Sequence, residues 1–339
     1  MSISQSGLPR DTFAKFSPHP YLLKNLDPAE GEPSRTNGRA PQTARPFDVN
    51  LSSLTHAHGS ALVKTGGTTA ICGVRGETLL ASDIPNFRAS NRDTELADYD
   101  LLVPNIELAT GSAPQFLPGV PPTDLAQTLS TRVYSLLHRS GLVKADGLRV
   151  WHDGFKTGDE DRMEDEEESK IGDTEPVVMA YWVLYIDIFF VSYDGNPFDV
   201  AWAAIVAALK DTRLPEARWD PDREMVLCSS KNWTELGLEG LPAACTAGVF
   251  TEKDAERPSQ GRYWLILDPD GQEEELCEEI ITTVVDCSGG DTRILSISKH
   301  GGTVASPEHL KAFIKIAEKR WDDFRVALKG QAEETKSTS

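Results

Sequence analysis

The chain of 339 residues carries 53 acidic and 34 basic side chains, for a formal net charge of −19. A uniform field of this sign repels phosphates, so the composition excludes an ordinary basic nucleic-acid-binding module, while 39% hydrophobic residues exclude global disorder. The acidity is local, however: residues 153–175 carry a net charge of −8 and residues 268–279 carry −7, which leaves −4 for the rest.

The N-terminal region is predicted to lead from a helix into strands. Residues 9–26 predict a short helix, followed by a loop. From Phe47 to Leu51 apolar and polar residues alternate, as in a half-buried strand. The turn residues Gly66-Gly67 between two apolar runs predict a β-hairpin of Ser60–Thr65 and Thr68–Arg75.

The middle of the chain combines a short apolar segment, a helix and an acidic run. Leu101–Val103 is the apolar segment. Residues 121–140 predict a helix in which Pro121 and Pro122 occupy the first turn. The acidic run Asp159–Glu168 has almost nothing to bury and predicts a disordered surface insertion. A calcium loop and a binding module for basic partners are the alternatives, although the EF-hand ligand spacing is missing.

The C-terminal half begins with the most apolar segment, Tyr181–Tyr193, which predicts a long central strand. Asn196 is the predicted N-cap and Pro197 the first residue of an alanine-rich helix to about Lys210. A last helix is predicted from Pro307 to Gly330. Further strands, completed as a meander, are predicted at Met225–Ser229, Ala247–Phe250, Tyr263–Leu267, Ile280–Asp286 and Ile294–Ser298.

This order predicts an α+β fold in a single large domain with two β-rich halves packed with helices. Residues 1–45 form an N-terminal extension, residues 46–330 the domain with the insertion 153–175, and residues 331–339 a polar tail. No apolar signal segment opens the chain. The five cysteines form no CxxC pair and are expected to be reduced, so we expect a soluble intracellular protein.

Motifs that carry chemistry are scarce. Lys64 precedes Gly66-Gly67, which favours a hairpin turn over a phosphate loop. His56 and His58 would lie on one face of a strand, as metal ligands can, but no third ligand is near in sequence. Asp187 inside the apolar strand is either a buried general base or a strand residue that faces a polar interface. We therefore expect no metal and no cofactor.

Several segments together resemble the RNase PH family, over about residues 20 to 328. In the family's arginine–glycine–arginine motif, asparagine stands here where aspartate is usual. The matching segments are Arg35–Arg39 with Arg45-Pro46, Gly59–Val74, Pro118–Pro122 with Ala126-Gln127, Trp182–Asp187, Tyr193–Asn196, Ala203–Lys210 and Asp268–Glu275. Within the family, the closest resemblance is to the non-catalytic branch in the ring of the eukaryotic RNA exosome.

The resemblance implies an RNase PH-like fold and a structural role in a hexameric ring around an RNA channel. The expected partners are other RNase PH-like ring subunits, with one of which the chain would form a heterodimer. RNA-binding cap subunits and RNA in the shared central channel are expected as well. A membrane is not expected, and the implied location is the nucleus and nucleolus, and also the cytoplasm.

The resemblance also bears on catalysis. Active members hold the attacking phosphate with a Gly-Thr-Arg or Gly-Ser-Arg loop after the central strand, and the matching residues here are Asn196, Pro197 and Phe198. Proline lacks an amide donor and phenylalanine has no charge. Active members also carry an acidic cluster on the next strand, which here reads Met225–Ser230 without a carboxylate. The resemblance therefore predicts no catalytic residues; the alternative is an active phosphate-dependent 3′→5′ exoribonuclease.

Candidates for RNA contact are few. Arg88 and Arg92 lie in a loop that, by analogy with the family, follows the first hairpin near the channel mouth. Lys64 is a weaker candidate. The simpler alternative is that all three are ordinary solvated cations.

Overall fold

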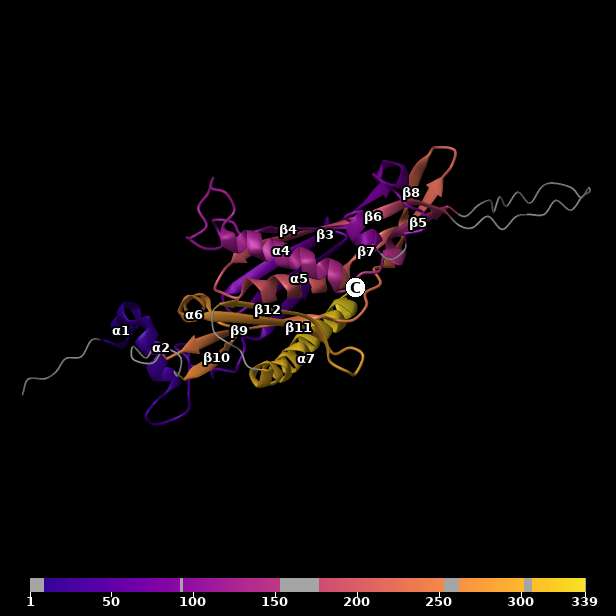
Figure 1. The fold of residues 1–339 in the computed structure, drawn as a ribbon. Coiled ribbons are helices and arrows are strands. Elements are labelled where there is room, and N and C mark those ends of the chain that lie inside the picture. The colour runs from indigo at the N-terminus through magenta and orange to yellow at the C-terminus, as the bar shows by residue number, and fades with distance from the viewer. Residues whose placement is uncertain (1–8, 92–93, 153–176, 253–261, 302–306, 339) are drawn as a thin grey trace, which may run out of the picture.

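Two β-sheets with helices between them form the fold (Figure 1). The computed structural model describes residues 9–91, 94–152, 177–252, 262–301 and 307–338. The mixture of sheets and packed helices confirms the predicted α+β class. The predicted acidic insertion 153–175 lies outside the described residues.

The first sheet has the strand order β1-β2-β3-β6-β4, and β5 also pairs with β6. Among the described strands of this sheet, β4 and β6 run parallel and the other pairs are antiparallel. The predicted hairpin is confirmed, because β2 and β3 meet at a turn in which Gly66 has a φ of +58°. The strands are β1 (Phe47–Leu51), β2 (Gly59–Thr65), β3 (Thr68–Leu80), β4 (Leu102–Glu107), β5 (Arg149–His152) and β6 (Val177–Ser192).

The second sheet is antiparallel and has the order β10-β9-β11-β12. The predicted meander is wrong, since β9 lies between β10 and β11. Two further strands, β7 and β8, pair only with each other as a separate hairpin. The strands are β7 (Arg213–Asp220), β8 (Met225–Glu235), β9 (Ala243–Thr251), β10 (Tyr263–Leu267), β11 (Glu279–Asp286) and β12 (Arg293–Gly301).

Three long helices pack between the two sheets and contact strands of both. Helix α5 (Pro197–Asp211) contacts β2 and β3 on one side and β9 on the other. Helix α4 (Asp124–Arg139) contacts β4 and β12, and α7 (Pro307–Thr338) contacts β1, β9 and β11. The helices therefore bury the inner faces of both sheets, and Figure 1 shows α5 between them.

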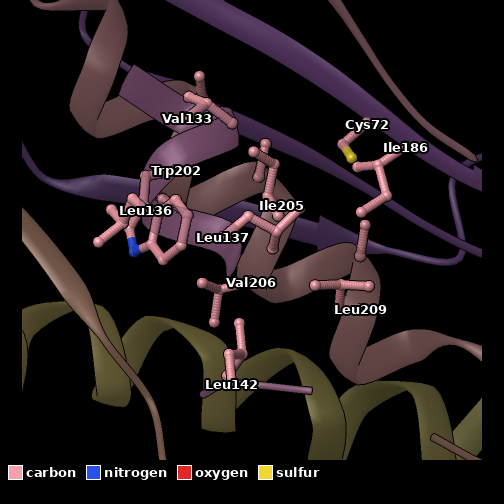
Figure 2. Close-up of a cluster of buried hydrophobic side chains, with 14 of the residues drawn as sticks. Cys72, Val133, Leu136, Leu137, Leu142, Ile186, Trp202, Ile205, Val206 and Leu209 are labelled. Atoms are coloured by element: carbon pink, nitrogen blue, oxygen red, sulfur yellow. The ribbon is translucent and has the colours of Figure 1, made fainter. Parts of the chain in front are cut away.

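Helix α5 is the centre of the hydrophobic core. All its residues from Pro197 to Leu209 are buried, and its many alanines let its backbone approach both sheets closely. Figure 2 shows Trp202, Ile205 and Leu209 of this helix among apolar side chains of α4 and the first sheet. Each fully buried large aliphatic side chain contributes about 1.5–3 kcal/mol through the hydrophobic effect. The packing also explains why α5 has little amphipathic character.

Several helix boundaries differ from the predictions. Residues 9–26 form two helices, α1 (Arg10–Phe16) and α2 (Pro18–Leu26). Pro121 and Pro122 precede α4, because Thr123 is its N-cap and accepts a hydrogen bond from the Ala126 amide. The last helix does not end at Gly330 but continues to Thr338. The remaining short helices are η1 (Ala81–Asp83), α3 (Glu95–Asp98), η2 (Ala145–Leu148) and α6 (Gly271–Leu276).

Helix α6 lies within the second acidic segment, residues 268–279. Its first turn is closed by a capping box between Asp270 and Glu273. Asp268 and Glu273 are buried, so part of this segment lies inside the protein rather than in a solvated loop. None of the described helices is both long and apolar enough to cross a membrane.

Candidate functional site

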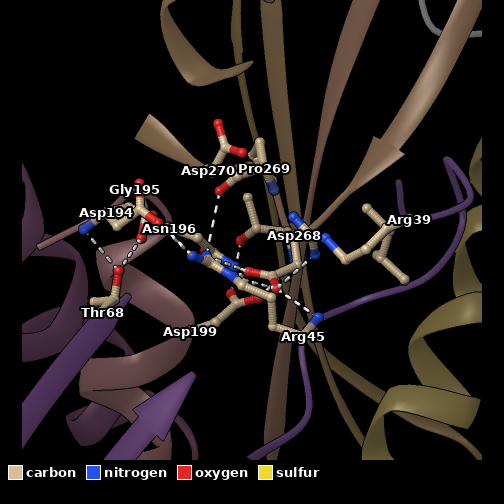
Figure 3. Close-up of polar contacts among 12 residues, drawn as sticks. Arg39, Arg45, Thr68, Asp194, Gly195, Asn196, Asp199, Asp268, Pro269 and Asp270 are labelled. Carbon is tan, nitrogen blue, oxygen red and sulfur yellow. Dashed lines mark hydrogen bonds and ion pairs between the residues drawn. The ribbon is translucent and has the colours of Figure 1, made fainter. Parts of the chain in front are cut away.

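The loop that enters α5 meets the end of β10 at a buried polar cluster (Figure 3). Gly195 has a φ of +74° and Asn196 a φ of +48°, so the chain makes a left-handed turn immediately before the helix. Asn196 is the N-cap by position, but its side chain makes no capping hydrogen bond. Its amide group points into the cluster instead, and the first turn of α5 lacks the usual side-chain cap.

Arg45 and Asp268 form the central ion pair of this cluster. Arg45 donates from Nε to Asp268 Oδ2 and from Nη2 to Oδ1, both at 2.8 Å. The Arg45 backbone amide donates to the same Oδ2 atom at 2.8 Å. Burial alone would raise the pKa of Asp268, but the hydrogen bonds and charge of Arg45 hold this pKa below its ordinary value. Asp268 is therefore an ionised carboxylate with its oxygens occupied.

Asp199 is a second buried carboxylate at the same place. Asn196 links the two acids, because its Nδ2 donates to Asp268 Oδ1 at 2.7 Å and to Asp199 Oδ2 at 2.9 Å. Thr246 of β9 donates to Asp199 from its amide at 2.9 Å and from its hydroxyl at 2.6 Å. Burial raises the pKa of Asp199 despite these hydrogen bonds.

Glu274 of α6 accepts a hydrogen bond from the backbone amide at the start of α5. Its Oε1 accepts a hydrogen bond from the Asn196 amide at 2.7 Å, and its Oε2 accepts one from the Tyr193 hydroxyl at 3.1 Å. Burial raises the pKa of Glu274 to about 7. An internal carboxyl group thus takes the amide that a bound anion would use at this helix N-terminus.

The next two residues offer little to an anion themselves. Pro197 has no amide hydrogen, and the Phe198 side chain is buried and apolar. However, the Arg132 guanidinium of α4 lies over the Phe198 ring, with its carbon 4.0 Å from the ring centroid. The inference that this position carries no charge is true of Phe198 alone; its surroundings include a cation.

These residues line a cleft of about 330 Å³ between the start of α4, the start of α5 and the second sheet. Asn196, Phe198 and Glu274 contribute from around the loop, and Arg132 from α4. No residue of β8 lines the cleft, because β8 belongs to the separate two-stranded sheet. The lack of carboxylates at Met225–Ser230 therefore gives no information about the chemistry of this cleft.

The carboxylates beside the loop come from elsewhere in the chain. Asp199 lies in α5, Asp268 follows β10, and Glu274 lies in α6. The expected absence of the acidic cluster concerned Met225–Ser230 alone, and it stays a prediction. What distinguishes these acids is that their oxygens are already hydrogen-bonded within the protein.

The arginines that precede β1 have structural contacts. Arg35 is 1% exposed and donates to Glu273 at 3.2 Å and to the carbonyl of Leu267. Arg39 lies 3.6 Å from Asp268 and 3.8 Å from Glu273. This part of the predicted N-terminal extension is thereby held against the end of β10 and the start of α6.

The predicted RNA-contact residues are not brought together. Lys64 is exposed at the turn end of β2, paired in register with Thr69. Arg88 is exposed beyond η1, which follows the other end of β3. Strand β3 has 13 residues, so the two ends are about 40 Å apart. Arg92 lies outside the described residues.

Two other sequence candidates do not form reactive sites. His56 and His58 lie in the loop between β1 and β2 rather than on a strand, and His58 Nδ1 accepts a hydrogen bond from the Gly76 amide at 2.9 Å. Asp187 is exposed and accepts a hydrogen bond from Asn105 at 3.1 Å, which excludes the buried general base. In the described part of the chain, no three His, Cys, Asp or Glu side chains are grouped as metal ligands.

The fold and this cleft fit a known class of protein. The model of the 3′ exoribonuclease family, domain 1, matches residues 43–215, and the model of domain 2 of that family matches residues 240–320. The chain therefore belongs to the 3′ exoribonuclease (RNase PH) family, which confirms the resemblance seen in the sequence.

Two curated relatives and one solved structure show which members of the family this chain resembles. The exosome complex component rrp43 of Schizosaccharomyces pombe is 30% identical over 94% of this chain and 98% of its own length. The exosome complex component Rrp42 of Methanopyrus kandleri is 29% identical over 88% of this chain and 91% of its own length. A solved Archaeoglobus fulgidus exosome with RNA bound to the active site has a similar fold, with a TM-score of 0.63 and 21% identity over 91% of this chain and 96% of that chain.

The sequence indicated the loop but missed the residues around it. Asn196, Pro197 and Phe198 were identified by position, whereas Arg132, Asp199 and Glu274 were not. Asp199 had one available signal, since it is an acid in the first turn of a helix that is otherwise apolar. Arg132 and Glu274 look like ordinary surface charges in sequence, because helix α4 and the acidic segment are both rich in polar residues.

Proposed function

We propose that this chain is a non-catalytic subunit of the hexameric RNase PH-like ring of an RNA exosome. There it supports 3′→5′ RNA processing and degradation, including rRNA maturation and mRNA turnover, by partner nucleases. The family membership and the match to a relative named as an exosome component, over nearly the whole of both chains, support the assembly. A heterodimer with another RNase PH-like subunit is its expected building unit, with RNA-binding cap subunits and RNA in a shared channel as further partners.

One observation carries the non-catalytic part of the proposal. At the start of α5, the Asn196 amide is bonded to Glu274, Pro197 has no amide, and Phe198 replaces the arginine implied by the resemblance. An attacking phosphate needs preorganised donors and a cation at this place. The Asn196 amide is occupied, Pro197 has no amide hydrogen, and Phe198 offers its backbone amide but no charge. Catalysis of phosphorolysis is accordingly assigned to partner subunits.

The decisive experiment co-expresses the chain with candidate RNase PH-like partners and measures the native mass. We expect a stable heteromeric complex and no release of nucleoside diphosphates when the isolated chain is incubated with RNA and inorganic phosphate. A stable monomer that ignores every such partner would overturn the ring assignment.

An active phosphate-dependent 3′→5′ exoribonuclease is the second candidate. The convergence of Asp199, Asp268 and Glu274 beside the loop favours it. Release of nucleoside diphosphates by the wild-type chain, lost in Asp199→Asn, would establish this function. The paired variant is essential, because it separates intrinsic activity from a co-purifying nuclease.

Location and RNA contact are parts of the same proposal. An exosome subunit of this branch is expected in the nucleus and nucleolus, and also in the cytoplasm, which fluorescence of a tagged chain would test. Arg88 and Lys64 are exposed and remain candidates for RNA contact at opposite ends of the first sheet. Crosslinking of RNA to the assembled ring would detect either contact.

A further inference from the structure

The two N-terminal helices border a second pocket, the α1–α2 pocket. It has a volume of about 490 Å³ and lies between α1, the last turn of α2 and the loop that follows α2. It shares no lining residue with the cleft beside Asn196, and Figure 1 shows the two helices at one end of the molecule. Two cations, Arg10 and Lys24, line the pocket, and none of its described lining residues is acidic.

Helix α2 anchors this pocket to the body of the protein. Its Leu22 and Leu26 side chains are buried against Phe250 of β9 and Ile266 of β10. Helix α1 in turn packs on α2. Because burial of apolar side chains is the main stabilising force in such contacts, the α2 wall of the pocket is fixed to the second sheet.

An aromatic pair holds one of the two cations in place. The rings of Phe13 and Tyr21 meet edge to face, with their centroids 6.1 Å apart. Arg10 Nε donates a hydrogen bond to the Tyr21 hydroxyl at 2.5 Å, and the guanidinium carbon lies 5.6 Å from the centroid of that ring. The two terminal nitrogens of Arg10 have no hydrogen-bond acceptor among the described residues. An oriented guanidinium thus keeps free N–H donors for an acceptor from outside.

The two cations also lack acidic partners. Among the side chains that the structure describes, no carboxylate forms an ion pair with Arg10 or Lys24. Asp27, which follows α2, is paired instead with Arg262 at 2.6 Å. In a chain with a net charge of −19, the pocket is therefore a local reversal of charge. Its charge complements carboxylates, which can accept two parallel hydrogen bonds from a guanidinium.

The surroundings of the pocket favour a peptide over a nucleic acid. Glu30 and Glu32 are exposed in the loop beyond it and would repel a strand of successive phosphates. A short acidic peptide needs only the two cations, and its apolar side chains can pack on the aromatic surface of α1. This surface includes Phe13 and also Phe16, whose side chain is 79% exposed. Exposed aromatic residues next to cations are typical of protein interfaces.

We propose that the α1–α2 pocket docks an acidic peptide segment of a partner protein. The carboxylates of the segment pair with Arg10 and Lys24, and an apolar side chain of the segment packs on Phe13. The pocket does not depend on the ring assignment, because it is built entirely from α1, α2 and the loop after them.

The test measures the fluorescence anisotropy of a labelled peptide, Glu-Asp-Glu-Trp-Glu-Asp, titrated with the purified full chain. We expect it to bind at least about tenfold more tightly than the neutral peptide Gln-Asn-Gln-Trp-Gln-Asn, and to lose this preference at high salt. Arg10→Gln and Lys24→Gln should each weaken binding by about fivefold, the size expected for an exposed ion pair, and the double variant should abolish the preference. Lys15→Gln, an exposed cation of α1 outside the pocket, is the matched control and should change binding by less than about twofold.

A short oligouridylate forms the second arm of the test. If it binds as tightly as the acidic peptide and loses binding in the same double variant, the pocket belongs to a nucleic acid and the proposal is overturned. Equal binding of the two peptides, binding of neither, or equal effects of Lys15→Gln and Lys24→Gln would overturn it as well. Because Arg10 also contacts Tyr21, Lys24→Gln decides the outcome if Arg10→Gln lowers the melting temperature. Ring assembly is read separately by native mass, so either proposal can fail alone.

Discussion

The Asp268 carboxylate accepts two hydrogen bonds of 2.8 Å from the Arg45 guanidinium. This ion pair joins the segment before β1 to the end of β10. Two further segments bond to this pair. Asn196, at the entry of α5, donates to Asp268, and Arg320 of α7 donates to the Arg45 carbonyl at 2.7 Å. Four segments distant in sequence therefore meet at one buried ion pair. The candidate cleft lies beside this junction, because Asn196 contributes to both.

Replacing Arg45 by Met should lower the free energy of unfolding by about 3–5 kcal/mol, because a buried carboxylate is left without its partner. The double variant Arg45→Met/Asp268→Leu should lose less than the sum of the single variants. Urea denaturation of all four proteins measures the coupling. Additive losses would show that the pair is not a stabilising unit.

The same ion pair predicts a pH dependence. The pKa of Asp268 is lowered in the folded state, so its stabilising contribution is complete above the unfolded pKa of about 3.9 and is lost as the pH falls through the folded value. The cost of Arg45→Met should accordingly shrink below about pH 4. A cost that stays constant from pH 7 to pH 3 would contradict this assignment.

Glu274 should change the stability with pH in the opposite direction to Asp268. Its pKa of about 7 lies above the unfolded value, so the folded state binds the extra proton and loses stability as the pH rises toward 7. Glu274→Gln removes this titration while its side-chain oxygen can still accept from Asn196. Relative to wild type, the variant should gain about 2 kcal/mol between pH 5 and pH 8, measured by denaturation. A difference that is flat with pH would rule out the raised pKa.

Gly195 and Gly119 form a matched pair, since both have a φ of +74°. A Cβ at Gly195 would lie 2.5 Å from the Asp270 carbonyl carbon, whereas nothing lies within 4 Å at Gly119. Gly119→Ala should cost about 1 kcal/mol from backbone strain alone. Gly195→Ala should cost at least about 2 kcal/mol more, because the α5 entry must move away from α6. Equal melting temperatures of the two variants would show that the contact is not tight.

Thiol labelling tests the burial of the cysteines. Cys72 and Cys245 are buried, Cys277 and Cys287 are intermediate, and Cys228 in β8 is exposed. A thiol reagent added to the native protein should therefore modify Cys228 first, and Cys228→Ser should remove the fast phase. Complete labelling in denaturant is the control for the other four. A fast phase that persists in the variant would place another thiol at the surface.

Local patterns predicted the elements whose cause lies within a few residues. The alternation from Phe47 to Leu51 and the run Tyr263–Leu267 correspond to β1 and β10, and Pro197 begins α5 as expected. Helix α6 has no helical signal of its own, because Asp268-Pro-Asp-Gly271 has turn residues, of which Asp270 here also caps a short helix. Strand β7 was missed, since the alternation of apolar residues in Arg213–Asp220 is weak.

The amino-acid sequence by itself determined the α+β class, most strand and helix positions, the family and the position of the loop Asn196–Phe198, because these depend on residue identity and short-range periodicity. Tertiary structure alone decided that β9 lies between β10 and β11, that Glu274 bonds the Asn196 amide, and that Arg132 covers Phe198. Glu274 and Arg132 are separated from their partners by more than 60 residues. Such contacts arise from the packing of whole elements, which also gives an ordinary arginine or glutamate its burial, its pKa and its partner.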